Sequence, residues 1–356
     1  MRVAVIFNRN SSSINTLHAE IGRELAIVLR HHQPIVHEEY GAGNLPDAHY
    51  RISETTVAGA DYKAMLRQAV LDMLALQPEF FITVGGDGLA AYVADVLITT
   101  GGAQRTYATV PILGIAAGTA NVGPIVSIRP DQLNGLDLKA LKRIPAGAVQ
   151  VQDGGDVVGY GFNDVIIGNS LLTTIDGETE NISVAELVAH DRKVVIRPGT
   201  RIAGAGFKVL LNGSPVSLDG YPQPMDIKQI VVTSLQFDRL YGRAIMGAFV
   251  RGGYEEHVAA IGLCDRVIVD SAPAAEVEKE FTTMRQLTFT EGDSVVLGGF
   301  AEDAHLVIDG NPYLRRHDEL TFRYLSGLVT LCALPSAEKA GKNSLLRPSP
   351  MRQGGI

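Results

Sequence analysis

A single carboxylate inside a run of glycines is the first place in the chain where chemistry can be expected. A strand-like run over residues 80–84 is followed by Gly85, Gly86, Asp87 and Gly88, and then by an Ala-rich amphipathic stretch. A glycine turn between a strand and a helix exposes backbone N–H groups that can bind phosphate beside the positive end of the helix. Because Asp87 repels that anion, it needs another role: it can reach a hydroxyl next to the phosphates, or it can cap the helix.

A second glycine turn follows the next predicted strand, residues 111–116, and contains Gly118, Thr119 and Asn121. Open α/β sheets bind their ligands at the carboxyl ends of the strands, where these two turns would lie side by side. Together they would form a wide phosphate cradle in which Thr119 and Asn121 donate hydrogen bonds without adding charge. The alternative is a helix start that one of these two residues caps.

A third candidate is the pair Asn163 and Asp164, which begins an apolar run. In a strand, successive side chains face opposite sides, so only one of the two would point into a cleft. Asn-Asp is also ordinary turn chemistry, and a turn is the alternative interpretation.

The elements that must position these residues change in character along the chain. Residues 1–145 alternate strand-like runs with helical patterns, which predicts a parallel sheet covered on both faces. From about residue 146, strand-like segments separated by turn residues dominate. These segments are 155–168, 192–198, 206–218, 227–235, 265–271, 294–300, 305–310, 319–325 and 327–334.

The predicted fold is therefore an α/β N-terminal domain with a parallel sheet plus a β-rich C-terminal domain. We place the first domain at residues 1–145 and the second at residues 146–335. Residues 336–356 lose periodicity and gain polar residues and prolines, which predicts a mobile C-terminal tail.

The composition favours a soluble globular protein. Hydrophobic residues make up 46% and charged residues 20% of the 356 residues, and the formal net charge is −8. A dense basic tract is missing, which argues against nucleic acid, and no run approaches the roughly 20 apolar residues that cross a bilayer. The N-terminal apolar run is too short for a signal peptide. We expect a cytoplasmic homo-oligomer that binds neither nucleic acid nor a membrane.

Metal-ligating and basic side chains give weaker signals. Cys264 and Cys332 lie far apart and the nine histidines are scattered, which predicts a reducing compartment and no metal site built by the protein. Four basic residues surround the predicted strand 192–198, and we expect them to protect a strand edge, with contact to a substrate phosphate as the alternative. They are Arg192, Lys193, Arg197 and Arg201.

Three stretches, in their order and separation, resemble the superfamily of NAD kinases and diacylglycerol kinases. They are "VGGDG", "PILGIAAGTAN" and "FNDVII", at residues 84–88, 111–121 and 162–167. Residues 305–334 are similar to the closing strands of that superfamily, which carry an Asp-Gly turn followed by a strand pair. Within it, "GTAN" is closer to the lipid kinases. The length and the substitutions also resemble the branch named for the acetoin catabolism protein X.

The resemblance implies an active site between the two domains. It implies that Gly85, Gly86 and Gly88 line the nucleotide phosphates and that Asp87 approaches the hydroxyl that accepts the phosphoryl group. Asn163 and Asp164 match an Asn-Glu pair that holds the nucleotide substrate. ATP with magnesium would be the donor, and NAD a nucleotide substrate.

The sequence also departs from the pattern of that superfamily. Leu89 stands where Thr is usual, Asp164 is one methylene shorter than Glu, and residues 231–247 lack the Gly-Ser-Thr-Ala-Tyr type segment that helps to bind NAD. Three functions therefore stay open: an ATP-dependent kinase acting on a nucleotide such as NAD or NADH, a regulatory nucleotide-binding protein without kinase activity, and a lipid or polyol kinase.

Overall fold

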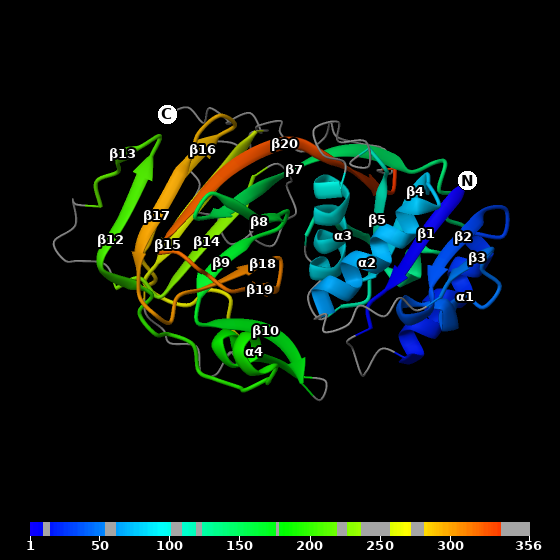
Figure 1. The fold of residues 1–356 in the computed structure, drawn as a ribbon, viewed down its shortest axis with the longest axis horizontal. Coiled ribbons are helices and arrows are strands. Elements are labelled where there is room, and N and C mark those ends of the chain that lie inside the picture. Colours follow the sequence, from blue (N-terminus) through cyan, green and yellow to red (C-terminus); the bar gives the residue numbers. More distant parts are fainter. Residues whose placement is uncertain are drawn as a thin grey trace, which may run out of the picture.

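The computed structural model consists of an α/β half and a β-rich half, joined by two long strands (Figure 1). It describes residues 1–9, 15–53, 62–100, 109–118, 123–175, 178–218, 226–235, 257–271 and 281–335. Thr119, Asn121 and the predicted tail 336–356 lie outside these ranges. None of the helices within them is long and apolar enough to cross a membrane.

The α/β half is a parallel sheet in which strands and helices alternate along the chain. Its order begins β3-β2-β1-β4-β5, and each of these neighbours pairs in parallel. The elements are β1 (Arg2–Phe7), α1 (Asn15–Val28), β2 (Gln33–His37), β3 (Tyr50–Ile52), α2 (Tyr62–Ala75), β4 (Phe80–Gly85), α3 (Asp87–Thr100), β5 (Ile112–Ala116) and β6 (Val126–Ile128). Short 3-10 turns span Glu38–Tyr40, Ala42–Asn44 and Pro130–Gln132.

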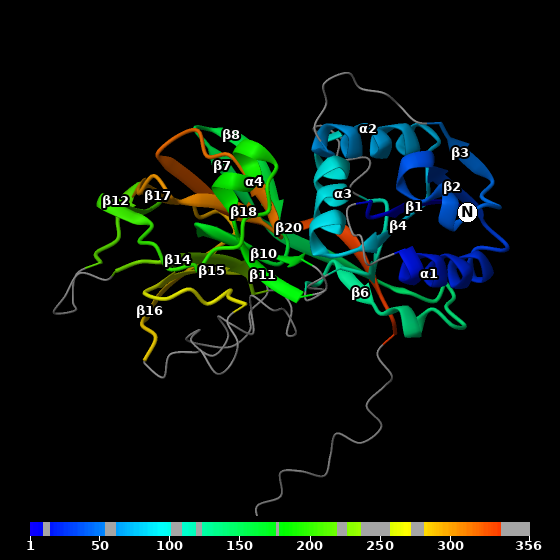
Figure 2. The same ribbon diagram turned by 90° about the horizontal axis from the view of Figure 1, so that it is seen from below.

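Side-chain alternation explains why helices cover both faces of this sheet. In β1, Val3 and Val5 pack with Leu25 of α1, whereas Ala4 and Ile6 belong to the core beneath α2 and α3. Figure 2 shows α1 on one face of the sheet and α2 and α3 on the other. A parallel sheet buried in this way needs near-continuous apolar strands, which is the pattern that predicted it.

The β-rich half is a sandwich of antiparallel sheets. One layer has the strand order β16-β15-β14-β9-β18-β19, and the other is formed by β13-β12-β17-β20 with β7 and β8. Its elements are β7 (Lys142–Asp153), β8 (Asp156–Gly161), β9 (Val165–Gly168), β10 (Ser170–Ile175), β11 (Glu178–Ser183), α4 (Val184–His190), β12 (Ala203–Leu211), β13 (Ser214–Pro215), β14 (Gln229–Ser234), β15 (Val258–Cys264), β16 (Met284–Thr290), β17 (Val295–Phe300), β18 (His305–Ile308), β19 (Asn311–Tyr313) and β20 (Glu319–Ala333). The hairpin β10–β11 and α4 share a small core with the outer face of the first layer.

Two long strands, β7 and β20, run from one half into the other (Figure 1). They pair antiparallel with each other, and Leu331 near the end of β20 pairs in parallel with Ile112 of β5. The last strand of the chain therefore completes the sheet that the first residues begin. The expected boundary at residue 145 falls inside β7.

The comparison with solved structures, given below, confirms the predicted fold class, but several predicted strands are wrong in detail. Residues 319–325 and 327–334 form the single strand β20, which tolerates the break because Gly327 adopts a positive φ of 57° and the register shifts there. Residues 265–271 are not a strand, since the side chain of Gln229 accepts from their backbone N–H groups at Ile268 and Val269.

Residues 192–198 form only an isolated bridge, between Val195 and Ile182, in place of the predicted strand. The basic residues around it are partly used in ion pairs. Arg192 lies 2.5 Å from Glu186 of α4, and Arg201 lies 3.7 Å from Asp226. Because there is no strand here, strand-edge protection does not explain these charges.

Candidate functional site

Asp87 lies where the glycine turn after β4 passes into α3. It is the first residue of the helix and is 6% exposed. Both of its carboxylate oxygens accept from the backbone N–H of Gly123, at 3.2 and 3.1 Å. The second glycine turn therefore donates an N–H to the carboxylate itself, and the helix N-terminus stabilises a negative charge at this position.

The glycines around Asp87 are of two kinds. A Cβ on Gly85 would lie 2.9 Å from Leu89 Cδ2, and one on Gly88 would lie 3.0 Å from the carbonyl oxygen of Asp309. Close packing within the protein therefore favours glycine at both positions. Gly86, Gly88 and Gly118 are partly exposed.

Asn163 and Asp164 lie in the turn between β8 and β9, so the turn interpretation is the one that the structure shows. Strand alternation does not apply there, and both side chains are buried. A Cβ on Gly123 would lie 3.0 Å from both Asn163 Cβ and Asp87 Oδ1. The structure thus brings Asp87 and Asn163 together on two sides of Gly123.

The charge of Asp87 affects the neighbouring Asp164. Burial raises the pKa of Asp164 to about 7, and the negative charge of Asp87 acts in the same direction. A carboxyl group with this pKa is partly protonated at neutral pH and can then donate a hydrogen bond. Two neighbouring acids whose environments differ are a recurrent arrangement at sites of proton transfer.

Asp309 is a buried carboxylate that the motif analysis did not single out. It accepts from the backbone N–H groups of Phe162, Asn163 and Asp164 at 2.8, 2.8 and 2.9 Å. Burial raises the pKa of Asp309 well above its ordinary range and the charge of Asp164 adds to this, while the three N–H donors act against it. The Asp-Gly pair was the signal in the sequence that could have indicated this residue. Asp309 and Gly310 form the turn between β18 and β19, with φ values of 46° and 78°.

Thr233, in β14, is a second residue that the motifs did not indicate. Its hydroxyl donates to the carbonyl oxygen of Asn163 at 2.6 Å. It lies at the start of the segment 231–247 that stands in place of the missing NAD-binding motif. Sequence offered no signal for it, because the contact joins a strand to a turn that lies 70 residues earlier in the chain.

Two buried polar atoms near this turn lack a protein partner among the described residues. They are Oδ1 of Asn163 and Oγ of Ser234. The amide nitrogen of Asn163 donates to Asp164 at 3.4 Å, so its oxygen stays available. A buried polar atom without a partner is costly, and a ligand that donates a hydrogen bond would remove that cost.

Metal-ligating side chains do not gather in the part of the chain that the structure describes. Across the described ranges no group of three or more His, Cys, Asp or Glu side chains is arranged to hold a metal ion. Cys264 and Cys332 are both buried and unpaired, and burial raises the pKa of their thiols to about 12 and about 11.

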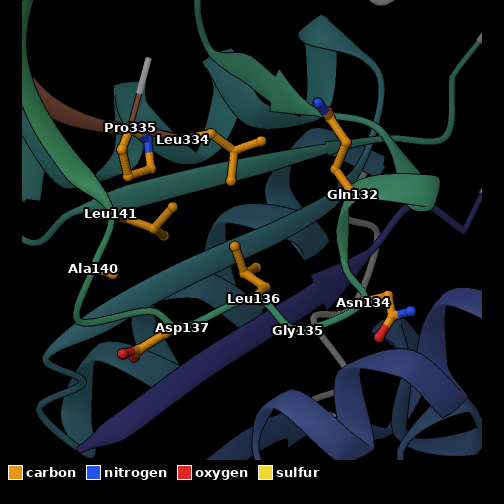
Figure 3. A pocket seen from close by; sticks show the side chains of 9 residues that line it. All are labelled: Gln132, Asn134, Gly135, Leu136, Asp137, Ala140, Leu141, Leu334 and Pro335. Carbon is orange, nitrogen blue, oxygen red and sulfur yellow. The ribbon is translucent and has the colours of Figure 1, made fainter. Parts of the chain in front are cut away.

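A separate hollow of about 210 Å³ lies between the segment after β6 and the end of β20 (Figure 3). Its lining includes Leu136, Leu141 and Leu334, with Gln132 and Asn134 at its polar edge. None of its lining residues in the described chain is a predicted site residue. We assign no role to it.

Comparison with known proteins identifies the fold. No family model matches the chain, and no curated protein sequence matches it. Among solved structures, yeast NADH kinase complexed with NADH is similar with a TM-score of 0.52 and 12% identity, covering 98% of this chain and 90% of that one. A diacylglycerol kinase-like protein from Bacillus anthracis str. Sterne has a TM-score of 0.50 and 14% identity, covering 93% and 97%. The chain therefore has the fold shared by NAD kinase and diacylglycerol kinase-like proteins.

Proposed function

We propose that the protein is an ATP-dependent kinase that transfers a phosphoryl group to a hydroxyl of a nucleotide such as NAD or NADH. The observation that carries the proposal is the position of Asp87, buried between two glycine turns and beside Asn163 and Asp164. The likeness to a NADH kinase supports a nucleotide as acceptor.

Phosphoryl transfer depends on alignment and charge stabilisation, because its transition state is loose. In the proposed mechanism, Asp87 orients the acceptor hydroxyl and accepts its proton late in the reaction. The accessible backbone of Gly86 and Gly118, with Thr119 and Asn121, binds the phosphates. Magnesium would neutralise phosphate charge and would arrive with ATP, because Mg²⁺ is usually bound through one or two carboxylates together with substrate phosphates.

The Asn163–Asp164 turn has the second role in the proposal. The free Oδ1 of Asn163 accepts a hydrogen bond from the nucleotide, and protonated Asp164 donates one. Burial keeps water away from both groups and strengthens these contacts.

The remaining expectations belong to the same proposal. They are a nucleotide site between domains 1–145 and 146–335, a homo-oligomer in the cytoplasm, and a place in the branch named for the acetoin catabolism protein X. Light scattering of the purified protein measures the oligomeric state, and a monomer would contradict that part.

The kinase proposal is tested with purified protein, ATP and magnesium, offered NAD, NADH, glycerol or diacylglycerol vesicles in separate reactions. We expect mass spectrometry to detect phosphorylated dinucleotide, and Asp87→Asn to reduce its formation by at least about 100-fold. Asp131→Asn is the matched control because that carboxylate is exposed, with 68% of its side chain accessible. Product from the lipid or polyol alone would move the assignment to that kinase class.

A regulatory nucleotide-binding protein is the second candidate, and Leu89 favours it. Its side chain is buried against Gly85, so the position that carries a hydroxyl in the resembling kinases is apolar here. This candidate predicts that calorimetry detects nucleotide binding while no acceptor is phosphorylated.

A further inference from the structure

The hairpin formed by β18 and β19 contacts both halves of the proposed site. On the side of the β-rich half, the carboxylate of Asp309 accepts from three successive backbone N–H groups, at residues 162–164. Three donors on one carboxylate fix the conformation of that turn. They therefore fix where Asn163 and Asp164 place their side chains.

On the side of the α/β half, Asn311, which lies two residues after Asp309, contacts the start of α3. The side-chain amide of Asn311 donates to the carbonyl oxygen of Gly88 at 3.0 Å. Gly88 directly follows Asp87. A Cβ on Gly88 would lie 3.0 Å from the carbonyl oxygen of Asp309, so the absence of a side chain there leaves room for the hairpin. The same turn thus holds the backbone next to Asp87.

A third contact fixes the outer strand of the hairpin. Lys63 of α2 donates from Nζ to the carbonyl oxygen of Pro312 at 2.5 Å, and the ammonium lies 3.6 Å from the ring centroid of Tyr313. The Tyr92 hydroxyl of α3 donates to the backbone carbonyl of Lys63 at 2.9 Å. A cation over an aromatic ring adds attraction to the hydrogen bond.

We propose that Asp309 and Asn311 are positioning residues that set the placement of Asp87 relative to the Asn163–Asp164 turn. The proposal rests on the proposed phosphoryl transfer, because that reaction needs the three side chains in one geometry. Asp87 lies on the α/β half and the turn lies on the β-rich half. In addition to the contact at Gly123, the hairpin holds Asp87 and the turn through Asp309 and Asn311, which are separated by Gly310 alone.

Asparagine suits position 311 because its amide N–H can donate to a carbonyl oxygen. Asn311→Asp keeps the size of the side chain but places a carboxylate against the Gly88 carbonyl, which repels it. Asp309→Asn keeps a residue type that tolerates the positive φ, and it replaces one of the two oxygens that accept the three backbone N–H groups with an N–H donor. Each variant therefore breaks one side of the link with little change of volume.

The test compares Asp309→Asn and Asn311→Asp with Leu314→Ser, whose side chain is exposed just after the same hairpin. For both site variants we expect kcat to fall by at least about 10-fold while KM for ATP and for the acceptor changes by less than about threefold. Leu314→Ser should match the wild type. A kcat that stays within about twofold of Leu314→Ser in both folded variants would overturn the proposal.

Amide hydrogen exchange gives a readout that does not need turnover. Asp309→Asn should accelerate exchange at Phe162, Asn163 and Asp164. Asn311→Asp should accelerate it at Gly123, whose N–H reports on the Asp87 carboxylate. If exchange at Gly123 is unchanged in Asn311→Asp, the positioning role is overturned, even when the protein is inactive. If the exchange rates change as expected but the wild type shows no turnover, the kinase proposal alone is overturned. If Asp309→Asn does not fold, Asn311→Asp decides, because its side chain is only partly buried.

Discussion

At the scale of single residues, the site combines a carboxylate that several elements hold in place with a second carboxyl group that is partly neutral. Asp87 is fixed by Gly123, and its charge, together with burial, raises the pKa of Asp164 to about 7. The raised pKa leaves Asp164 able to donate a hydrogen bond, whereas Asp87 is the carboxylate that accepts the proton in the proposed mechanism.

The raised pKa of Asp164 predicts a pH-dependent stability. Between the unfolded pKa of 3.8 and the folded pKa of about 7, the folded state holds a proton that the unfolded state has lost, so stability falls as pH rises. Asp164→Asn removes that cost. We expect it to raise the free energy of unfolding at pH 8 by about 2 to 4 kcal/mol and to change it little at pH 4.

Urea denaturation at pH 4, 6 and 8 measures this effect, with the exposed Asp156→Asn as control. A stability difference between Asp164→Asn and wild type that stays constant from pH 4 to pH 8 would show that the carboxyl group is not perturbed.

Gly123→Ala tests the arrangement around Asp87. The new Cβ would lie 3.0 Å from Asp87 Oδ1 and from Asn163 Cβ, so the two side chains must move apart. We expect kcat/KM for the kinase reaction to fall by about 10-fold or more, because small displacements at a reacting centre are costly. Gly43→Ala is the control, since nothing lies within 4 Å of its Cβ position. Equal activity of the two variants in the same assay would contradict the geometry.

At the scale of elements, sequence periodicity located strands but did not say how they continue. The break in the apolar pattern near Gly327 predicted two strands, whereas β20 continues through it with a register shift between Leu325 and Val329. The bulge lets one strand pair with β17 near its beginning and with β5 near its end.

Substitutions at Gly327 test the bulge. Its φ of 57° is left-handed, and open space surrounds the Cβ position, so the backbone alone determines the cost. We expect Gly327→Ala to lower the free energy of unfolding by about 1 kcal/mol, Gly327→Asn by less and Gly327→Val by more. Gly206→Ala in β12, where space is also open, is the control in denaturant titrations. The reverse order of Asn and Val would exclude this explanation.

At the scale of the whole molecule, the two halves share one strand pair, and a core cluster of the α/β half extends to Tyr160 and Phe162 at the end of β8. Leu328 and Leu331 of β20 pack beneath α3, in the same cluster as Phe162 from the turn that leads to the site. Halves joined by a shared core are expected to unfold together.

Leu331→Ala tests this coupling. Loss of a side chain that is 3% exposed should lower the free energy of unfolding by about 2 to 4 kcal/mol. Hydrogen exchange in denaturant should show the same midpoint shift for β4 in one half and β14 in the other. Ile27→Ala, on the exposed side of α1, should shift neither. A shift confined to β4 would mean that the halves unfold independently.

The sequence by itself determined the alternation of strands and helices in the α/β half, the glycine turn with Asp87 after β4, and the Asn163–Asp164 turn. These features are local, because periodicity and turn chemistry act between near neighbours along the chain. The tertiary structure alone decided that Asp309 binds the backbone of Phe162 across 147 residues and that Asn311 binds Gly88 across 223. No local pattern encodes such contacts, since they exist only once packing brings separate strands and helices together.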